Sequence, residues 1–422
     1  MKYQIPFLSL IAVFFFGCIN EFAPDIPSAA TRLVIEGGIT NNPGPYYIKL
    51  SKTEQLDFTI VQSTDVFEPT TNAQVTISDL QGNEEILTEV TSGLYATDLS
   101  GNGIRGEIGQ RYQLSIVTST GEVYQSTFDE MLPVPELDSV SLDFEFADTE
   151  INSALDPLDI FNFAFPGVDS STFVNDLGPV VRRTELNGIG GFLIGTEASL
   201  GSSIPVTPPT QLGMRVRAVT QDPIENRNYY RWRVFGTFDA FTQPERFVVI
   251  GDVANPNSSQ PVRNFYNIPR ECCSRCWVDF ELTDLFLSDD RLSNGQRLVE
   301  ETALIPLNNF VFQNRVYLNV EQQSLNLGAY QFYQGIEKQI SDVGGIFDTA
   351  PALSISNITN PDDPEDIVLG YFIVAGVSTK SRWVTRRQLP VGVGDFLYPD
   401  DCRNLSNQIL TSTTNRPAFW PD

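Results

Sequence analysis

The sequence predicts a mainly β protein, in which an N-terminal immunoglobulin-like β-sandwich is followed by a larger β-rich domain with one packed helix. From Arg32 onward, short β-branched or aromatic runs separated by turn residues recur, as they do in antiparallel sheets. One helical period stands out at about residues 324–341, and a nearly unbroken apolar run follows it at 367–377. With 422 residues, 41% of them hydrophobic, the chain can bury more than one core.

Residues 1–17 are predicted to be a lipoprotein signal peptide. Lys2 precedes a mainly apolar run that is too short to span a membrane, and Gly17-Cys18 follows it. A Cys directly after a small residue is the lipoprotein pattern, in which Cys18 becomes the acylated N-terminus. The alternative is an ordinary signal peptide with an unmodified Cys18. Residues 18–30 contain two prolines and little periodicity, so we expect a tether there.

Residues 31–133 are predicted to form the immunoglobulin-like sandwich. Several short strand patterns fall within about 100 residues, which is the usual size of this fold. Tyr112, Leu114 and Ile116 alternate with polar residues, which predicts a strand with one buried face and one solvated face. Pro133-Val134-Pro135 is the expected linker to the second domain.

Residues 134–422 are predicted to form the β-rich C-terminal domain, with a long insertion at about 148–211. The insertion is rich in Gly, Ser, Thr and Pro and shows no sustained period. Long irregular loops of this kind are functional or mobile. Farther along, Arg231 and Arg233 alternate with apolar residues, so they share one face of a strand. We expect a solvated face on which both arginines pair with acidic side chains.

The stretch from Ser324 to Trp383 is expected to organise this domain. Ser324 is the expected cap of the helix, and Gly344-Gly345 is a stop signal after it. The apolar positions that recur at helical spacing are Ala329, Phe332, Tyr333, Ile336 and Ile340. The run from Ile367 to Val377 is apolar almost throughout. A strand of this kind buries both faces, so we expect it at the centre of a sheet with the helix packed over it.

Charge and composition exclude several classes of function. The formal net charge is −26, so nucleic acids and anionic membrane faces are poor partners. The chain contains no histidine, which removes Ser-His-Asp and Cys-His catalysis and His-ligated zinc. We therefore expect no enzyme activity, no cofactor and no metal centre. A mechanism that uses carboxylates alone remains as the enzymatic alternative.

Four cysteines besides Cys18 are expected to form disulfides, because an even set in an exported chain is typical of them. They are Cys272, Cys273, Cys276 and Cys402. Pairing of the adjacent Cys272 and Cys273 would need a strained ring, so Cys402 is expected to join Cys272 or Cys273, with Cys276 taking the other. A Cys₄ zinc site fits badly with two adjacent ligands. A redox pair at Cys273 and Cys276 lacks its usual βαβ context.

Acidic residues cluster at three places, which are Asp289-Asp290, Asp362–Asp366 and Asp400-Asp401. The Asp362–Asp366 cluster could hold calcium through carboxylates and loop carbonyls, but the twelve-residue calcium-loop pattern is absent. A solvated turn is the expected structure of the Asp362–Asp366 cluster, as for most charge runs.

Several motifs of the chain resemble those of an uncharacterised lipoprotein family of Bacteroidota. Its C-terminal signature is matched at Tyr330–Tyr333, Gly344–Pro351, Asn357–Asn360, Val368–Phe372 and Ser378–Lys380. Further matches are Asp222-Pro223, Asn228–Trp232 and Cys276-Trp277. Members of that family are surface or outer-membrane lipoproteins, commonly encoded beside TonB-dependent transporters. The resemblance carries no functional residues with it, because the family has no agreed activity.

The resemblance implies a non-enzymatic, surface-exposed outer-membrane lipoprotein, anchored by acyl chains on Cys18. Its expected partner is an integral outer-membrane β-barrel, most simply a TonB-dependent transporter for which it captures or admits a ligand. Two alternatives are a subunit of an outer-membrane assembly or secretion machine and a carboxylate-dependent enzyme that cleaves glycans or peptides. Within the chain, we expect the 148–211 insertion to contact the partner, because binding residues gather on long loops.

Overall fold

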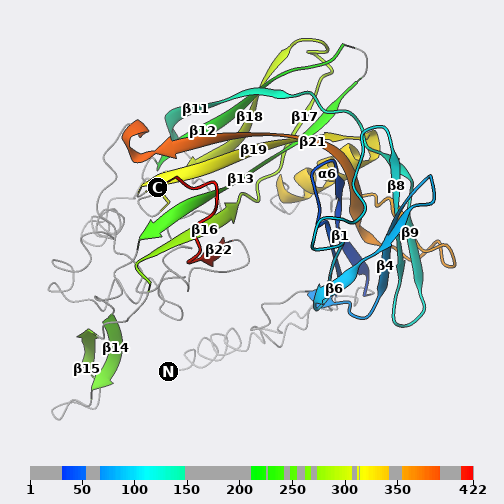
Figure 1. Ribbon diagram of the computed structural model, residues 1–422, viewed down its shortest axis with the longest axis horizontal. Helices are drawn as coiled ribbons and strands as arrows, with labels where there is room; N and C mark the ends of the chain where they lie inside the picture. Colours follow the sequence, from blue (N-terminus) through cyan, green and yellow to red (C-terminus); the bar gives the residue numbers. More distant parts are fainter. Residues whose placement is uncertain are drawn as a thin grey trace, which may run out of the picture.

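The computed structural model of the protein describes residues 31–53, 67–147, 211–224, 227–241, 248–253, 262–267, 273–306, 311–312, 314–341, 354–389 and 410–421. The described strands form four sheets, and α6 (Leu327–Ser341) is the one α-helix among these residues. The predicted fold class, mainly β with one packed helix, is confirmed (Figure 1).

One sheet of eleven strands runs through the molecule. Its strands are β1 (Leu33–Thr40), β2 (Tyr47–Thr53), β3 (Phe67–Pro69), β6 (Thr88–Thr91), β7 (Leu94–Ala96), β13 (Tyr229–Phe241), β16 (Arg275–Glu281), β17 (Phe286–Asp289), β19 (Arg315–Leu325), β21 (Leu369–Thr385) and β22 (Leu410–Thr413). The order is β22-β16-β13-β19-β21-β1-β2-β7-β6, with β17 paired to β13 and β3 to β2. N-terminal and C-terminal strands thus share one continuous sheet.

Three smaller sheets accompany it. The first contains β4 (Gln74–Asp79), β5 (Glu84–Ile86), β8 (Arg111–Val117), β9 (Val123–Ser126), β10 (Asp129–Glu130) and β20 (Ile358–Thr359). The second contains β11 (Leu137–Ala147), β12 (Gln211–Gln221) and β18 (Arg297–Pro306). The third is an antiparallel hairpin of β14 (Val248–Val253) and β15 (Val262–Asn267).

The first sandwich packs the β4–β8–β9 sheet against the end of the long sheet that contains β1, β2 and β7. Tyr112, Leu114 and Ile116 of β8 are buried and their neighbours are not, as their alternation predicted. The core also contains Ile358, Val368, Phe372 and Val374, which come from far beyond the predicted linker at 133–135. Residues 31–133 therefore complete their core with C-terminal side chains.

The second sandwich packs the β11–β12–β18 sheet against the other end of the long sheet. Its core joins Met214 and Val216 of β12 to Trp232 of β13 and Val320 of β19. On β21, Phe372 and Val374 belong to the first core and Val384 to the second. These three are an even number of residues apart, so they lie on one face of the strand. Both small sheets thus cover the same face of the long sheet.

Strand β21 is the central strand that the apolar run at 367–377 predicted. Residues 371–377 are buried on both faces, and the strand lies between β19 and β1. It pairs with β19 in antiparallel and with β1 in parallel. This one strand therefore connects the two sandwiches.

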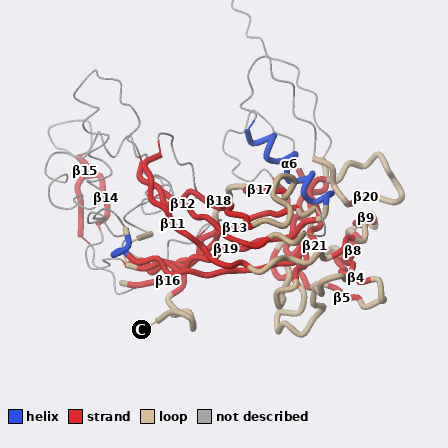
Figure 2. Tube along the Cα trace, turned by 90° about the horizontal axis from the view of Figure 1, so that it is seen from above, coloured by secondary structure: helices blue, strands red, loops and turns tan. Residues whose placement is uncertain are grey.

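Helix α6 packs on the opposite face of the long sheet, against the neighbouring strands β13, β19 and β21. Figure 2 shows the helix above these strands. Ala329 and Phe332 of the helix are buried against Tyr371, Ile373 and Ala375 of β21. This packing of the helix over the apolar strand confirms the predicted arrangement.

Two details of the helix prediction are wrong. Ser324 is not the cap, because it lies within β19, where it pairs with Gly376 of β21. Asn326 caps the helix instead, since its side-chain oxygen accepts a hydrogen bond of 2.7 Å from the backbone N–H of Ala329. Ile340 is 71% exposed in the last turn and does not join the packed face.

Candidate binding site between the two sandwiches

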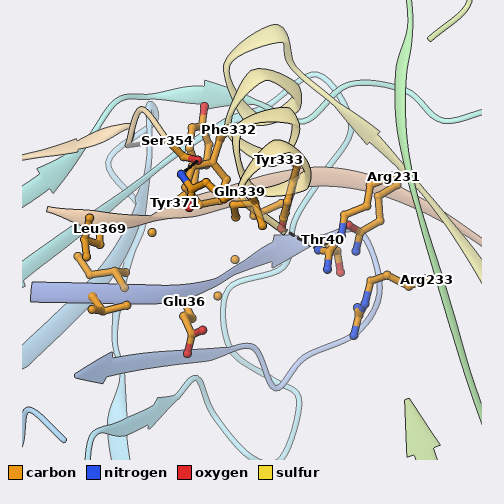
Figure 3. A pocket seen from close by; sticks show the side chains of 18 of the residues that line it. Glu36, Thr40, Arg231, Arg233, Phe332, Tyr333, Gln339, Ser354, Leu369 and Tyr371 are labelled. Atoms are coloured by element: carbon orange, nitrogen blue, oxygen red, sulfur yellow. Dashed lines mark hydrogen bonds between the residues drawn. The ribbon is translucent and has the colours of Figure 1, made fainter. Parts of the chain in front are cut away.

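A cavity of about 710 Å³ lies beneath α6, between β1 of the first sandwich and β13 of the second (Figure 3). We call it the helix cavity. Its apolar wall comes from Ile35, Phe332, Ile336, Leu369 and Ile373. Its polar wall comes from Glu36, Arg231, Arg233, Gln323, Tyr333, Gln339 and Ser354. A concave, largely apolar space with a few converging polar groups at a domain junction is the usual form of a small-molecule site.

Strand β13 supplies both arginines of the cavity. Trp232 and Val234 point into the second core, so Arg231 and Arg233, which alternate with them, point to the face that carries α6. Arg231 and Arg233 therefore reach into the helix cavity side by side (Figure 3). The alternation in the sequence predicted their shared face, but the cavity arises only because α6 covers part of that face.

Arg233 is held by two carboxylates. Its guanidinium donates to Glu281 at 2.5 and 2.9 Å and to Glu321 at 3.0 Å. The Glu321 side chain is 8% exposed and also accepts a hydrogen bond of 2.8 Å from Gln323. Burial lowers the pKa of the Arg233 guanidinium, but the charges of Glu321 and Glu281 outweigh it and raise the pKa above its usual value. The predicted pairing with acids is confirmed for Arg233.

Arg231 behaves differently. Its guanidinium donates a hydrogen bond of 2.7 Å to the hydroxyl of Tyr333 and a longer one of 3.5 Å to Gln323. It also lies over the Tyr333 ring, 4.4 Å from the centroid. Burial raises the pKa of the Tyr333 hydroxyl, although the positive charge of Arg231 lowers that pKa in part. Among the described residues Arg231 has no carboxylate partner, so the predicted pairing with acids is wrong for this residue.

The motifs that carry the family resemblance divide into two groups. Arg231, Phe332, Tyr333, Gly370 and Tyr371 line the helix cavity, although they come from three separate stretches of the chain. Nothing in the spacing of these stretches shows that they meet. The pairing of β21 with both β19 and β1 brings them together.

Two of the other motifs, those of Asn357 and Asp222, hold the backbone, whereas Gly344–Pro351 lies outside the described residues. The Asn357 side chain donates a hydrogen bond of 3.0 Å to the carbonyl of Phe372 and accepts one of 2.9 Å from its N–H. The buried carboxylate of Asp222 accepts hydrogen bonds from the Tyr230 hydroxyl at 2.8 Å and from the Gly295 N–H at 3.0 Å. These contacts explain the two motifs as structural.

Only some of the predicted covalent sites lie among the described residues. Cys273 and Cys276 are both disulfide-bonded. Cys18, Cys272 and Cys402 lie outside the described residues, and so does almost all of the 148–211 insertion. The lipidation of Cys18, the disulfide connectivity and the contact role of the insertion therefore stay predictions.

The acidic turn at Asp362–Asp366 is built by hydrogen bonds within the protein. Asn360 accepts from the backbone N–H groups of Asp362 and Asp363 at 3.0 and 3.3 Å. The Tyr124 hydroxyl donates to Asp366 at 2.8 Å. In the described ranges, no group of three or more Cys, Asp or Glu side chains is placed to hold a metal ion.

The structure is that of a β-rich protein of two sandwiches that share one sheet, with a cavity of about 710 Å³ at their junction. Within the described part of the chain, no helix is both long and apolar enough to cross a membrane. The family model described as domain of unknown function DUF4249 matches residues 19–381, and the chain belongs to this family. No curated protein and no solved structure matches the chain significantly.

Proposed function

We propose that the protein is a non-enzymatic, lipid-anchored subunit of an outer-membrane complex, which binds a ligand in the helix cavity. The cavity supports the proposal best, because it has the volume and the mixed apolar and polar walls of a small-molecule site. It is lined by both sandwiches, so a bound ligand would touch β1 and β13 at once.

The sequence supports the proposed anchor and the proposed partner. Cys18 directly after the apolar run supports acylation, and several acyl chains would make anchoring effectively permanent at about 0.8 kcal/mol per buried methylene. The resemblance to lipoproteins encoded beside TonB-dependent transporters supports an integral β-barrel of that class as the partner. The protein would present its ligand to the barrel from the cell surface.

The test is co-purification from gently solubilised outer membranes of the native organism. We expect the intact protein to bring down an integral β-barrel, and we expect deletion of residues 170–205 to abolish this while leaving the protein membrane-bound. Cys18→Ala should move the protein out of the membrane fraction. Purification of the intact protein alone would contradict the partner proposal, and a barrel of the assembly or secretion class would replace the transporter.

The cavity is tested separately. Ser354→Trp puts a large side chain at the wall of the helix cavity, where Ser354 is partly exposed. We expect this variant to keep the barrel partner and to lose transporter-dependent growth on the ligand. Ser100→Trp, on an exposed turn of the first sandwich, is the matched control and should change neither. Normal growth of the Ser354→Trp strain would count against the cavity as the site.

A further inference from the structure

A second cavity, of about 550 Å³, lies on the same face of the long sheet, farther along β13, β16 and β19. We call it the aromatic cavity. Arg233 and Glu281 line both cavities, so the polar group around Arg233 separates two compartments of one groove. The aromatic cavity is lined in addition by Phe235, Tyr317 and Phe419 and by Asp279, Asn319 and Thr411.

The aromatic wall is a fixed stack of rings. Phe419 stacks on Tyr317 with 4.7 Å between the centroids and 30° between the planes. Trp383 packs against the other rings, 4.7 Å from Tyr317 and 4.9 Å from Trp420. Trp420 is 1% exposed and anchors the C-terminal segment, whereas Phe419 is 50% exposed. A large ring is therefore held in place with one half in water, although burial would be more favourable.

The polar wall faces the rings across the strands. Asp279 is exposed and Asn319 is partly exposed, and both carry planar groups that can accept hydrogen bonds. The Thr237 hydroxyl donates to Asp279, which fixes the orientation of that carboxylate. Arg233 neutralises part of the charge of Glu281 and Glu321. The cavity thus combines a flat apolar surface with several hydrogen-bond acceptors.

The three longer strands at this cavity have no free edge, and the edge strand of the described sheet here is β22, whose Thr411 also lines the cavity. β13 pairs with β16 and β19, β16 with β22, and β19 with β21, so each of the three strands has neighbours on both sides. A peptide that binds by strand addition needs a free strand edge, and this cavity offers a sheet face. A ligand that lies on this face is therefore recognised by side chains. An anionic ligand is disfavoured by the net charge of −26 and by Asp279 at the wall.

We propose that the aromatic cavity binds a neutral oligosaccharide. One face of a sugar ring carries C–H groups that can stack on Phe419 and Tyr317, and its hydroxyl groups can donate to Asp279 and Asn319. The helix cavity then accommodates the next part of the same ligand. The oligosaccharide would be the ligand of the proposed function, and its assignment rests on that proposed function.

The test is a titration of the purified full-length protein in detergent, followed by tryptophan fluorescence, because Trp383 contacts Tyr317 directly. The probes are cellohexaose, maltohexaose, laminarihexaose, xylohexaose and mannohexaose, with a hexapeptide of alternating Ala and Thr as the peptide probe. We expect saturable binding of at least one oligosaccharide. Phe419→Ala should weaken it roughly tenfold or more, which corresponds to about 1.4 kcal/mol.

Two other exposed phenylalanines are compared with Phe419, and Phe128 is the control. Phe67 is 48% exposed and lines the helix cavity, and Phe128 is 36% exposed on the first sandwich, outside both cavities. Phe128→Ala should leave the affinity unchanged. An equal loss of affinity in the Phe419→Ala and Phe128→Ala variants would show a nonspecific effect and overturn the proposal. If Phe67→Ala lowers the affinity for the oligosaccharide and Phe419→Ala does not, the sugar lies in the helix cavity alone, and the proposal is also overturned.

Failure of this proposal is distinguishable from failure of the proposed function. Binding of the peptide alone, or of none of the probes at millimolar concentration, overturns the oligosaccharide while co-purification with the barrel stands. Sugar binding by a protein that purifies without a barrel leaves this inference standing and overturns the partner.

Discussion

The α-carbon of Gly370 lies so close to Ile35 that a Cβ at position 370 would be 1.8 Å from the Ile35 carbonyl oxygen. The two residues are register partners in the parallel pairing of β1 with β21. Gly370 also has a φ of +94°, a conformation that side chains rarely adopt. The junction of the two sandwiches therefore depends on the absence of a side chain at one position of the motif Val368–Phe372.

Gly370→Ala should be strongly destabilising. Positive φ alone costs about 1–3 kcal/mol for a non-glycine residue, and the contact with Ile35 cannot be relieved without parting β1 from β21. We expect a loss of about 4 kcal/mol in the free energy of unfolding, measured by chemical denaturation. Gly82→Ala is the control, because Gly82 has a similar φ of +88° with nothing within 4 Å of its Cβ position. Equal losses in the two variants would contradict the role of the Ile35 contact.

Arg233→Met should be destabilising because it leaves Glu321 charged, 8% exposed and without its cation. Removing one partner of a buried ion pair costs about 3–5 kcal/mol, and we expect the lower end since Glu281 is half-exposed. The double variant Arg233→Met, Glu321→Gln should recover most of the loss, as a denaturation series would show. Lys49→Ala breaks the exposed Lys49–Glu36 pair and should cost less than about 1 kcal/mol. A double variant no more stable than Arg233→Met would disprove the explanation.

Local pattern predicted much of the fold. The alternation of Tyr112, Leu114 and Ile116 was enough to identify a half-buried strand, and the apolar run at 367–377 was enough to identify the central one. Periodicity could not separate Ser324 from the helix, because the end of β19 and the start of α6 are joined by Asn326 alone. A capping signal two residues farther along was the better indication.

The candidate site was less accessible to sequence reasoning. The alternation around Trp232 predicted that Arg231 and Arg233 share a face. Their different partners depend on which strands lie beside β13, and that is a property of the sheet order. Glu281 on β16 and Glu321 on β19 reach Arg233 only through this order. These two acids among 53 could not have been selected from spacing.

Three buried tyrosines should make the protein sensitive to alkali. Burial and a neighbouring carboxylate raise the pKa of Tyr124, Tyr230 and Tyr371 above the ordinary value of 10.0. The carboxylates belong to Asp366, Asp222 and Asp129 respectively. A folded-state pKa above the unfolded one means that the stabilisation is complete below pH 10 and is lost as the pH rises beyond it. We expect tyrosinate absorbance to appear together with unfolding above that pH.

The slope with which the free energy of unfolding falls with pH provides the control experiment. Each tyrosine that stays protonated in the folded state contributes about 1.4 kcal/mol per pH unit to the fall in stability above its unfolded pKa. Tyr371→Phe removes one such group, so its stability should fall less steeply above pH 10, even though it loses the bond to Asp129 at neutral pH. An unchanged slope would show that Tyr371 ionises without unfolding.

The disulfide connectivity is the last prediction. Cys273 and Cys276 are both disulfide-bonded, and the strained ring that an adjacent pair requires argues against a bond between Cys272 and Cys273. We expect peptide mapping by mass spectrometry without reduction to find Cys402 joined to Cys272 or Cys273, with Cys276 bonded to the other. A loop of about 130 residues closed in this way contributes about 4–5 kcal/mol in the chain-entropy model. Cys402→Ser should therefore lower the denaturation midpoint and leave one free thiol among the other three cysteines. Four free thiols in the native protein, or one bound zinc per chain, would contradict this connectivity.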